Sequence, residues 1–443
     1  MKIDAPKALG REKSCPQGYY YLKSAPALLF VQLAMNQPDD LAASSHDLNI
    51  KDENLARSQP QVQQRQLPWV DALRGLAIFG VLICHAGQNV ENLPSILGDL
   101  TYQGAMWVQL FYMISAFTLF LSLTNRKTTE KKPLINFFIR RFFRIAPLFY
   151  CAIAFYVLTT GIGRSYWVED GQSITIPNLI THLTFTNGWN LYWNLYWINS
   201  LVPVGWSIPI EMPFYLIVPY LFKKITTINQ AIWLTLIILF ISKLLNYIFS
   251  QNPLIPHHQI WDLFVVYWLP SQLPFFALDI VLYLLLIDTI KIQNLSQVSR
   301  KSQLKRTITP LFLISLFLAV FSYISKTQLG MLVFLYGIAL LGLAVFLSQH
   351  SVSLLVNRFW CYLGKISYSA YLTHLIVLYI VKNFLQRVLL LNLNLPPTAN
   401  LIMLLVFLLV GTIAISAITY KFIELPGLQL GRTLIAKIEA KAT

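Results

Sequence analysis

Long apolar runs dominate the chain from Pro68 onward and constrain its fold more than any other feature. A membrane-spanning helix needs about 20 predominantly apolar residues, and ten runs reach or approach that length. They cover residues 69–88, 104–124, 137–160, 205–222, 231–249, 269–288, 310–325, 330–348, 366–388 and 401–420. The sequence therefore predicts an all-α fold, a polytopic integral membrane helix bundle with about ten transmembrane helices.

The composition excludes an ordinary soluble protein. Only 12% of the 443 residues are charged and 56% are hydrophobic, whereas soluble domains carry about 25% charged residues. The 4 cysteines show no paired C-x-x-C spacing, which disfavours a disulfide framework or a zinc site. We therefore expect no metal and no bound cofactor, and the membrane lipid is the first partner that the sequence predicts.

The remaining charge is strongly basic, with 34 Lys and Arg against 19 Asp and Glu. Such an excess suits nucleic acid, an acidic substrate or a membrane surface. Most of the basic residues fall in segments that share one side if the N-terminus is cytoplasmic, notably 1–66, 125–144 and 289–309. The positive-inside rule then places both termini in the cytoplasm of a multi-pass inner (plasma) membrane protein. Because the basic residues are scattered, no nucleic-acid partner is expected.

Three regions follow from this pattern. Residues 1–66 are polar in their second half and too poor in large apolar side chains to form a core, so we expect a weakly ordered cytoplasmic tail. Residues 67–427 form the membrane domain, and residues 428–443 form a cytoplasmic C-terminal tail.

Ionisable residues within the first span are candidate functional groups, because charges inside a membrane are costly. Arg74 and His85 are eleven positions apart, which places them within about 20° on one helix face and roughly 16 Å apart along the axis. Asp71 shares that face. We expect this face to line a polar cavity; the alternative for His85 is a hydrogen-bonded structural histidine.

The third span begins with the basic string NFFIRRFFRIAPLFY. Arg141 and Arg144 share a face at i, i+3, and Arg140 points elsewhere. Guanidinium groups match phosphate oxygens well, so the pair predicts an anion site for a cytoplasmic phosphate-bearing cosubstrate. The alternative is that these arginines only satisfy the positive-inside rule.

The fourth span, VGWSIPIEMPFYLIVPYLF, places Ser207 and Glu211 four residues apart on one face. Pro209 and Pro213 bend the backbone and free polar groups for a cavity. We expect Glu211 at a depth similar to that of His85. A carboxylate beside an imidazole would fix its tautomer and support its cationic form, as a general base requires.

Other polar clusters admit a structural interpretation as well as a functional one. In LGKISYSAYLTH, Tyr371 and His374 share a face and either support the site or join helices. Glu424 near the end of the last span is expected to be a structural anchor. The aromatic segment 186–200 suits a membrane interface and also the stacking of sugar rings.

Taken together, these motifs resemble the membrane acyltransferase 3 family, which includes O-acetyltransferases of surface polysaccharides and related glycans. The resemblance spans residues 67–427 and is carried by five motifs in order. They are DALRGLAIFGVLICH with Arg74 and His85, RRFFRIAPLFY with Arg141 and Arg144, WSIPIEMPFY with Ser207 and Glu211, LGKISYSAYLTH, and FIELP. Pro209 is a less usual residue within the third motif.

The resemblance implies transfer of an acyl group, most often acetyl from acetyl-CoA as cosubstrate, to a hydroxyl of an extracytoplasmic glycan acceptor. Arg74, Arg141 and Arg144 would bind the donor phosphates, and His85 would act as base or acyl carrier. Glu211 would assist His85, while Asp71, Ser207, Tyr371 and His374 would support the site.

Two alternatives stay open at this point. A transporter or flippase of a glycan or lipid-linked intermediate would also contain buried ionisable residues and broken helices. A transferase that uses a longer acyl group, such as succinyl, would share the same motifs.

Overall fold

A computed structural model describes residues 67–160, 175–189, 201–255, 258–292, 329–350, 352–385 and 395–442, and these residues contain helices but no strand. The tail predicted for residues 1–66 lies outside this part of the chain. The helices in chain order are α3 (Pro68–Gly87), α4 (Ser95–Tyr102), η1 (Gln103–Trp107), α5 (Val108–Arg126), α6 (Pro133–Thr160), α7 (Ile176–Leu183), η3 (Gly205–Ser207), α8 (Ile208–Lys224), α9 (Ile228–Gln251), α10 (His258–Tyr267), α11 (Leu269–Ile292), α13 (Leu329–Gln349), α14 (Arg358–Lys365), α15 (Ser367–Leu385), α16 (Pro397–Thr419), the π-helical turn η5 (Tyr420–Glu424) and α17 (Leu425–Lys441).

The all-α prediction is confirmed for the described residues, and the expected spans among them coincide with helices. Six helical segments are long and apolar enough to cross a membrane. They are Pro68–Gly87, Ser95–Arg126, Pro133–Thr159, Ile228–Gln251, Trp261–Ile287 and Pro397–Lys441. The expected span 310–325 lies outside the described residues, so the total of ten stays a prediction. The protein is a multi-pass helical membrane protein.

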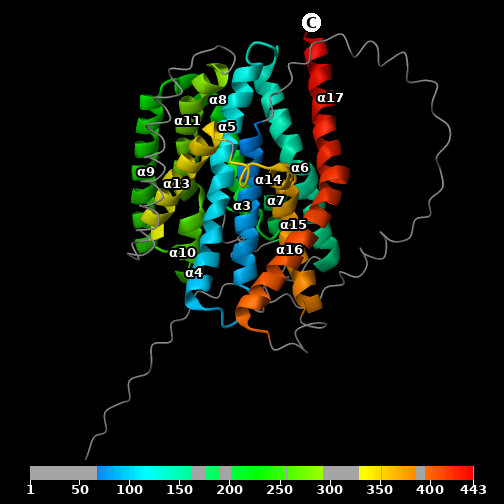
Figure 1. The fold of residues 1–443 in the computed structure, drawn as a ribbon. Helices are drawn as coiled ribbons and strands as arrows, with labels where there is room; N and C mark the ends of the chain where they lie inside the picture. Colours follow the sequence, from blue (N-terminus) through cyan, green and yellow to red (C-terminus); the bar gives the residue numbers. More distant parts are fainter. Residues whose placement is uncertain are drawn as a thin grey trace, which may run out of the picture.

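The helices form one bundle with α3 at its centre and α9 at its edge (Figure 1). α3 is apolar all round and largely buried, as a central helix must be. α9 instead exposes large apolar side chains at seven-residue intervals, at Trp233, Phe240 and Tyr247. An exposed apolar helix face suits contact with lipid tails.

A close approach between α14 and α3 fixes the start of the central helix. A Cβ atom on Gly364 would lie 1.8 Å from the backbone oxygen of Asp71. No side chain fits at that distance, so glycine is required where the two helices touch. Small residues that let backbones approach closely are typical of membrane helix packing. Gly364 is the glycine of the LGKISYSAYLTH motif, so the first part of this motif packs α14 against α3.

α17 continues the last span as a helix and packs along α6 (Figure 1). A Cβ atom on Gly427 would lie 2.6 Å from Cγ of Pro147, so this contact also depends on glycine. The predicted C-terminal tail, residues 428–443, is therefore helical as far as Lys441.

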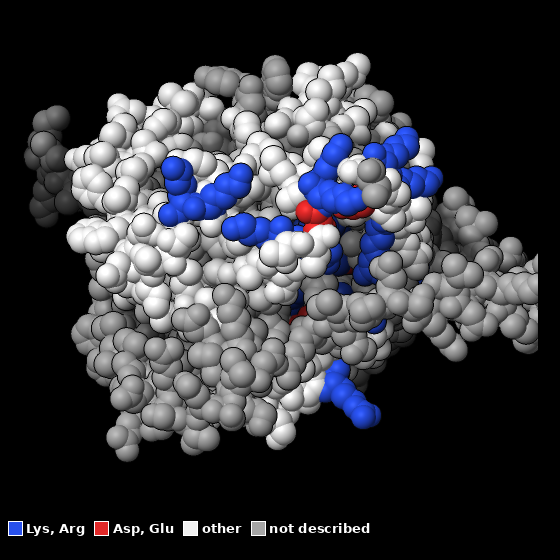
Figure 2. Space-filling model, turned by 90° about the horizontal axis from the view of Figure 1, so that it is seen from above, with Lys and Arg blue, Asp and Glu red and all other residues white. Residues whose placement is uncertain are grey.

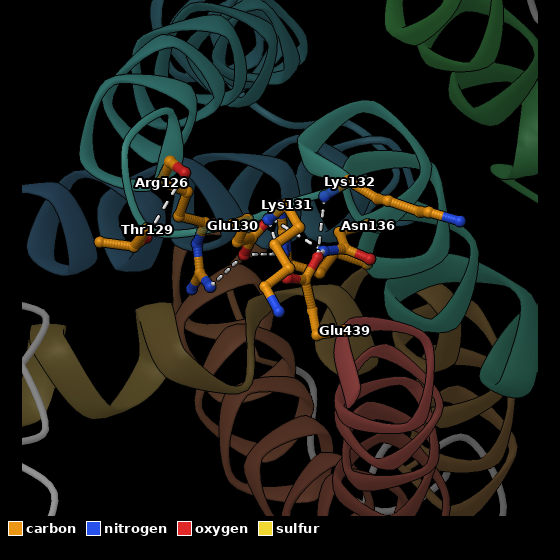
Figure 3. Close-up of polar contacts among 8 residues, drawn as sticks. Arg126, Thr129, Glu130, Lys131, Lys132, Asn136 and Glu439 are labelled. Carbon is orange, nitrogen blue, oxygen red and sulfur yellow. Dashed lines mark hydrogen bonds and ion pairs between the residues drawn. The ribbon is translucent and has the colours of Figure 1, made fainter. Parts of the chain in front are cut away.

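The far end of α17 is joined to the turn before α6 (Figure 3). The Glu439 carboxylate accepts hydrogen bonds from the backbone N–H groups of Lys131 and Lys132, at 2.8 and 2.9 Å, and from the Asn136 amide at 2.6 Å. These are N–H groups at a helix start, which lack partners within the helix. The contact brings the C-terminal end of α17 to the same end of the bundle as the start of α6.

That end of the bundle is basic and hollowed. Figure 2 shows Lys and Arg side chains gathered around a hollow, with acidic side chains visible inside it. Basic residues occur in the last turn of α5 at Arg126, just before α6 at Lys131 and Lys132, and in the last turn of α8 at Lys223 and Lys224. The asymmetry agrees with the positive-inside pattern of the sequence.

We predict that Gly364→Ala destabilises the bundle, because the added methyl group must push α14 away from α3. Overpacking of this kind costs about 1–3 kcal/mol, so the midpoint of thermal unfolding in detergent should fall. Gly98→Ala is the matched control, since a Cβ atom on Gly98 would have no neighbour within 4 Å. Equal unfolding midpoints for the two variants would contradict the close approach.

Candidate active site

The face predicted on the first span is present on α3. An Asp71 carboxylate oxygen lies 3.6 Å from Nη1 of Arg74, and Nη2 of Arg74 donates to the hydroxyl of Thr118 on α5 at 3.3 Å. His85 is buried near the other end of the helix. Eleven residues of helix separate Arg74 from His85, about 16 Å. One helix thus carries a cation toward the basic end and an imidazole away from it.

Arg144 forms an ion pair with Glu424, which comes from η5. Glu424 is fully buried, and its other carboxylate oxygen accepts a hydrogen bond from Ser369 of α15 at 2.8 Å. The guanidinium carbon of Arg144 also lies 5.8 Å from the ring centroid of Tyr368, within range for a cation–π contact. A π-helical turn inside an α-helix often marks a functional site, and here it brings the acid of FIELP to the arginine of RRFFR.

The two neighbouring arginines of the same string have different surroundings. Arg140 makes two hydrogen bonds to the Glu130 carboxylate, at 2.6 and 3.1 Å. Arg141 makes no ion pair or hydrogen bond to any residue that the structure describes, and its Nε is buried. Its electrostatic neighbours are Tyr215, Glu211 and the other arginines. Arg140 is therefore neutralised locally, whereas Arg141 is left available to an anion.

Glu211 lies on the arginine side of the bundle. Its carboxylate accepts a hydrogen bond from Tyr215, one turn later in α8, and interacts electrostatically with Arg141, Arg144 and Arg74. No hydrogen bond or ion pair joins Glu211 to His85 among the described residues. The structure therefore places Glu211 with the donor-binding candidates, and the direct contact with His85 that we expected from depth is not made.

The residue beside His85 is His374 of α15. Their ring centroids are 5.1 Å apart and the planes are inclined by 37°. Nδ1 of His85 lies 3.1 Å from Oε1 of Gln88, and Nδ1 of His374 lies 2.8 Å from the carbonyl oxygen of Tyr371. We call His85 and His374 the histidine pair, and Arg74, Arg141 and Arg144 the arginine cluster.

Buried tyrosines lie between these two groups. Tyr112 of α5 is 1% exposed, and its hydroxyl has no hydrogen-bond partner among the described residues. It interacts electrostatically with Tyr371, Glu211 and Tyr215. Tyr371 in turn packs against His374, with ring centroids 5.9 Å apart. Polar side chains therefore connect the arginine cluster to the histidine pair through the bundle.

The start of α8, which follows Trp206 and Ser207, is bound by Trp189 through a backbone carbonyl that a proline leaves free. Pro213 has no N–H, so it leaves the carbonyl of Pro209 without its partner within the helix. The indole N–H of Trp189 donates to that carbonyl at 3.0 Å. Ser207 is buried at the start of α8 and makes no side-chain capping bond. The aromatic segment 186–200 therefore touches α8 at Trp189, while residues 190–200 lie outside the described part.

Sequence reasoning missed Gln88, Tyr112 and Tyr215. Two of them carried a local signal, because Gln88 follows His85 by three residues and Tyr215 follows Glu211 by four, both helix-face spacings. Tyr112 carried none, since a single tyrosine in an apolar run is indistinguishable from a packing residue. Only the fold shows that it interacts electrostatically with Glu211 and Tyr371.

Comparison with known proteins gives one result that bears on this arrangement. A family model described as an acyltransferase domain matches residues 67–421. The match covers well over half of the chain and includes every residue of the arginine cluster and the histidine pair. No curated protein matches the chain.

We predict that Glu424→Gln destabilises the protein, because it leaves the charge of Arg144 unpaired inside the bundle. Removing one partner of a buried ion pair costs roughly 3–5 kcal/mol, and we expect the lower end of that range because the Arg144 side chain is 28% exposed. The measurement is the thermal unfolding midpoint in detergent. Asp99→Asn, which removes an exposed carboxylate, should leave the midpoint unchanged; equal losses would contradict a special role for Glu424.

Proposed function

The chain belongs to the membrane acyltransferase 3 family, and from this premise we propose that it moves an acetyl group from cytoplasmic acetyl-CoA to a hydroxyl of an extracytoplasmic glycan. The observation that carries the proposal is the separation of two chemically different groups along one bundle. The arginine cluster suits phosphate binding at the basic end, and the histidine pair suits proton transfer about 16 Å away.

The donor is proposed to bind with its phosphates at the basic hollow of Figure 2. Arg141 is the strongest candidate because it forms no ion pair or hydrogen bond with any described residue. Arg74 and Arg144 face the same region, but their guanidinium groups are held by Asp71 and Glu424. In this scheme those two arginines add positive potential around the bound phosphates, while Arg141 contacts them.

The pantetheine arm of the donor would then follow the buried tyrosines toward His85. Tyr112 offers a hydroxyl without a partner among the described residues, and such a donor can stabilise negative charge on the thioester oxygen. Gln88 can only accept through Oε1, so it holds the proton on Nδ1 of His85. Nε2 is then the basic nitrogen, which takes the hydroxyl proton or carries the acyl group.

With His85 as the base, the reaction proceeds in two steps. The acceptor O–H bond breaks and its proton moves to Nε2 of His85, while the oxygen forms a bond to the acyl carbon. The tetrahedral intermediate then loses CoA thiolate, which takes the proton from Nε2 of His85 to become the thiol. The enzyme returns to its starting state, and the products are the ester and CoA-SH.

A transporter or flippase is the competing function, and the family match does not favour it. The proposal is tested by mass spectrometry of surface glycans from cells with and without the intact gene. Loss of acetyl groups in the deletion strain, restored by the wild-type chain, is expected. Unchanged glycan acetylation would favour the transporter, and loss of a larger acyl group would identify another donor.

We predict that His85→Ala abolishes acetyl transfer while the protein remains expressed and membrane-inserted. General acid–base catalysis contributes about 10²–10⁴-fold to a rate, and an acyl carrier cannot be replaced by a methyl group. The measurement is acetyl transfer by purified protein at matched amounts. An active His85→Ala variant would contradict the assignment of His85.

We also predict that Arg141→Lys raises the KM for acetyl-CoA by about tenfold, because a lysine keeps the charge but loses the fork that binds phosphate oxygens. The neighbouring Arg140→Lys is the matched control, since Glu130 already occupies that guanidinium. Its KM should stay within about twofold of the wild-type value, as expected for a group already paired with a carboxylate. Equal effects of the two substitutions would argue against a donor site at Arg141.

A further inference from the structure

His374 carries a buried nitrogen that the proposed reaction has not used. Its side chain is fully buried, and Nε2 has no hydrogen-bond partner among the described residues. Buried polar atoms are rarely left in that state, and the cost is larger in an apolar membrane bundle. An unpartnered buried nitrogen beside a candidate catalytic residue therefore calls for a functional explanation.

The tautomer of His374 follows from its backbone contacts. Nδ1 lies 2.8 Å from the carbonyl oxygen of Tyr371 and 3.2 Å from that of Ala370. Carbonyl oxygens only accept hydrogen bonds, so Nδ1 carries the proton in the neutral ring. Nε2 is consequently a lone-pair acceptor, and α15 fixes its direction through these bonds.

His85 is in the same tautomeric state for a parallel reason. Oε1 of Gln88 accepts from Nδ1 at 3.1 Å, which leaves Nε2 as the basic nitrogen. The two rings are 5.1 Å apart between centroids. No hydrogen bond joins the two rings in the structure, and two neutral acceptor nitrogens would have no proton to share. One added proton would supply the missing donor.

The proposed reaction adds that proton when His85 deprotonates the acceptor hydroxyl. Glu211 does not face the resulting imidazolium, because its carboxylate is bonded to Tyr215 and faces the arginine cluster. The second imidazole is a neighbour of His85, with ring centroids 5.1 Å apart, and its Nε2 has no hydrogen-bond partner among the described residues. We propose that Nε2 of His374 accepts a hydrogen bond from protonated His85, so that the histidine pair holds the proton jointly during acyl transfer.

This inference rests on the proposed function and makes His374 a positioning residue that acts through His85. The atoms balance as before: the hydroxyl proton moves to Nε2 of His85, the N–H points to Nε2 of His374, and the same proton finally reaches the CoA sulfur. His374 forms and breaks no covalent bond. Its effect is to stabilise the cationic base in a region of low dielectric, where a charge-assisted hydrogen bond is strong.

Two substitutions of His374 separate this role from a purely structural one. His374→Asn keeps a donor at the position of Nδ1, and with it the bond to the Tyr371 carbonyl, but removes the Nε2 acceptor. His374→Gln removes the Nδ1 donor and places an amide oxygen near the position of Nε2. A structural role requires the donor at the position of Nδ1, whereas proton sharing requires the acceptor at the position of Nε2.

The experiment measures kcat and KM for acetyl transfer from acetyl-CoA by purified wild-type, Asn and Gln variants, with unfolding midpoints recorded for each. We expect the kcat of His374→Asn to fall by about 100-fold, the scale of general acid–base effects. The KM values for acetyl-CoA and for the glycan acceptor should stay within about twofold of the wild-type values. His374→Gln should retain kcat within about tenfold of wild type, because its oxygen still accepts the hydrogen bond.

The reverse ranking, an active Asn variant and an inactive Gln variant, would overturn proton sharing and leave His374 as a helix-packing residue. If both variants had the same kcat as the wild type, proton sharing would be overturned as well, while acetyl transfer as the function would stand. A wild-type protein that transfers no acetyl group from acetyl-CoA would instead reject the proposed function, and this inference with it. The two failures are therefore distinguishable in one set of measurements.

Discussion

The arrangement of the site depends on one constraint: a charge inside an apolar helix bundle must have a partner. The Arg144–Glu424 ion pair satisfies this constraint and connects α6 to the turn between α16 and α17. Ser369 adds a hydrogen bond to the same carboxylate and connects α15. Removing either charge would leave the other unpaired, at a cost far above that of a surface pair. The three helices are thereby held where the arginine cluster needs them.

The same constraint explains how neighbouring arginines acquire different roles. Arg140 is neutralised by Glu130 in the turn before α6, and Arg144 is neutralised by Glu424 within the bundle. Arg141 has no such partner among the described residues. A cation in that position attracts an anion from solution, and the basic hollow of Figure 2 offers the approach. The ion pairs of Arg140 and Arg144 thus hold the neighbouring residues in place, while the guanidinium of Arg141 forms no ion pair with a described residue.

Much of the fold and part of the site were predictable from sequence. Apolar length predicted the long helices among the described residues, and helical periodicity predicted that Asp71, Arg74 and His85 share one face of the first span. The contact between Asp71 and Arg74 agrees with that face. Periodicity describes one helix at a time, however. The expected neighbour of His85 was Glu211, chosen from depth alone, whereas helix packing places His374 there. Depth along the membrane normal does not determine which helices touch.

Other features could be found only from the structure, because they depend on contacts between residues that are far apart in the sequence. Glu424 was predicted as an anchor, but only the π-helical turn shows that it anchors Arg144. Gly364 is explained by a backbone contact with Asp71, distant in sequence. The hydroxyl of Tyr112 becomes notable only once Glu211 and Tyr371 surround it.

We propose that donor and acceptor chemistry are separated along the bundle, with the arginine cluster at one end and the histidine pair toward the other. The most direct test reconstitutes the protein in vesicles with a defined orientation and supplies acetyl-CoA and a glycan acceptor on chosen sides. The account predicts acetylated glycan only when acetyl-CoA is on the side of the basic hollow and the acceptor is on the opposite side. Equal product formation with both substrates confined to either single side would contradict it.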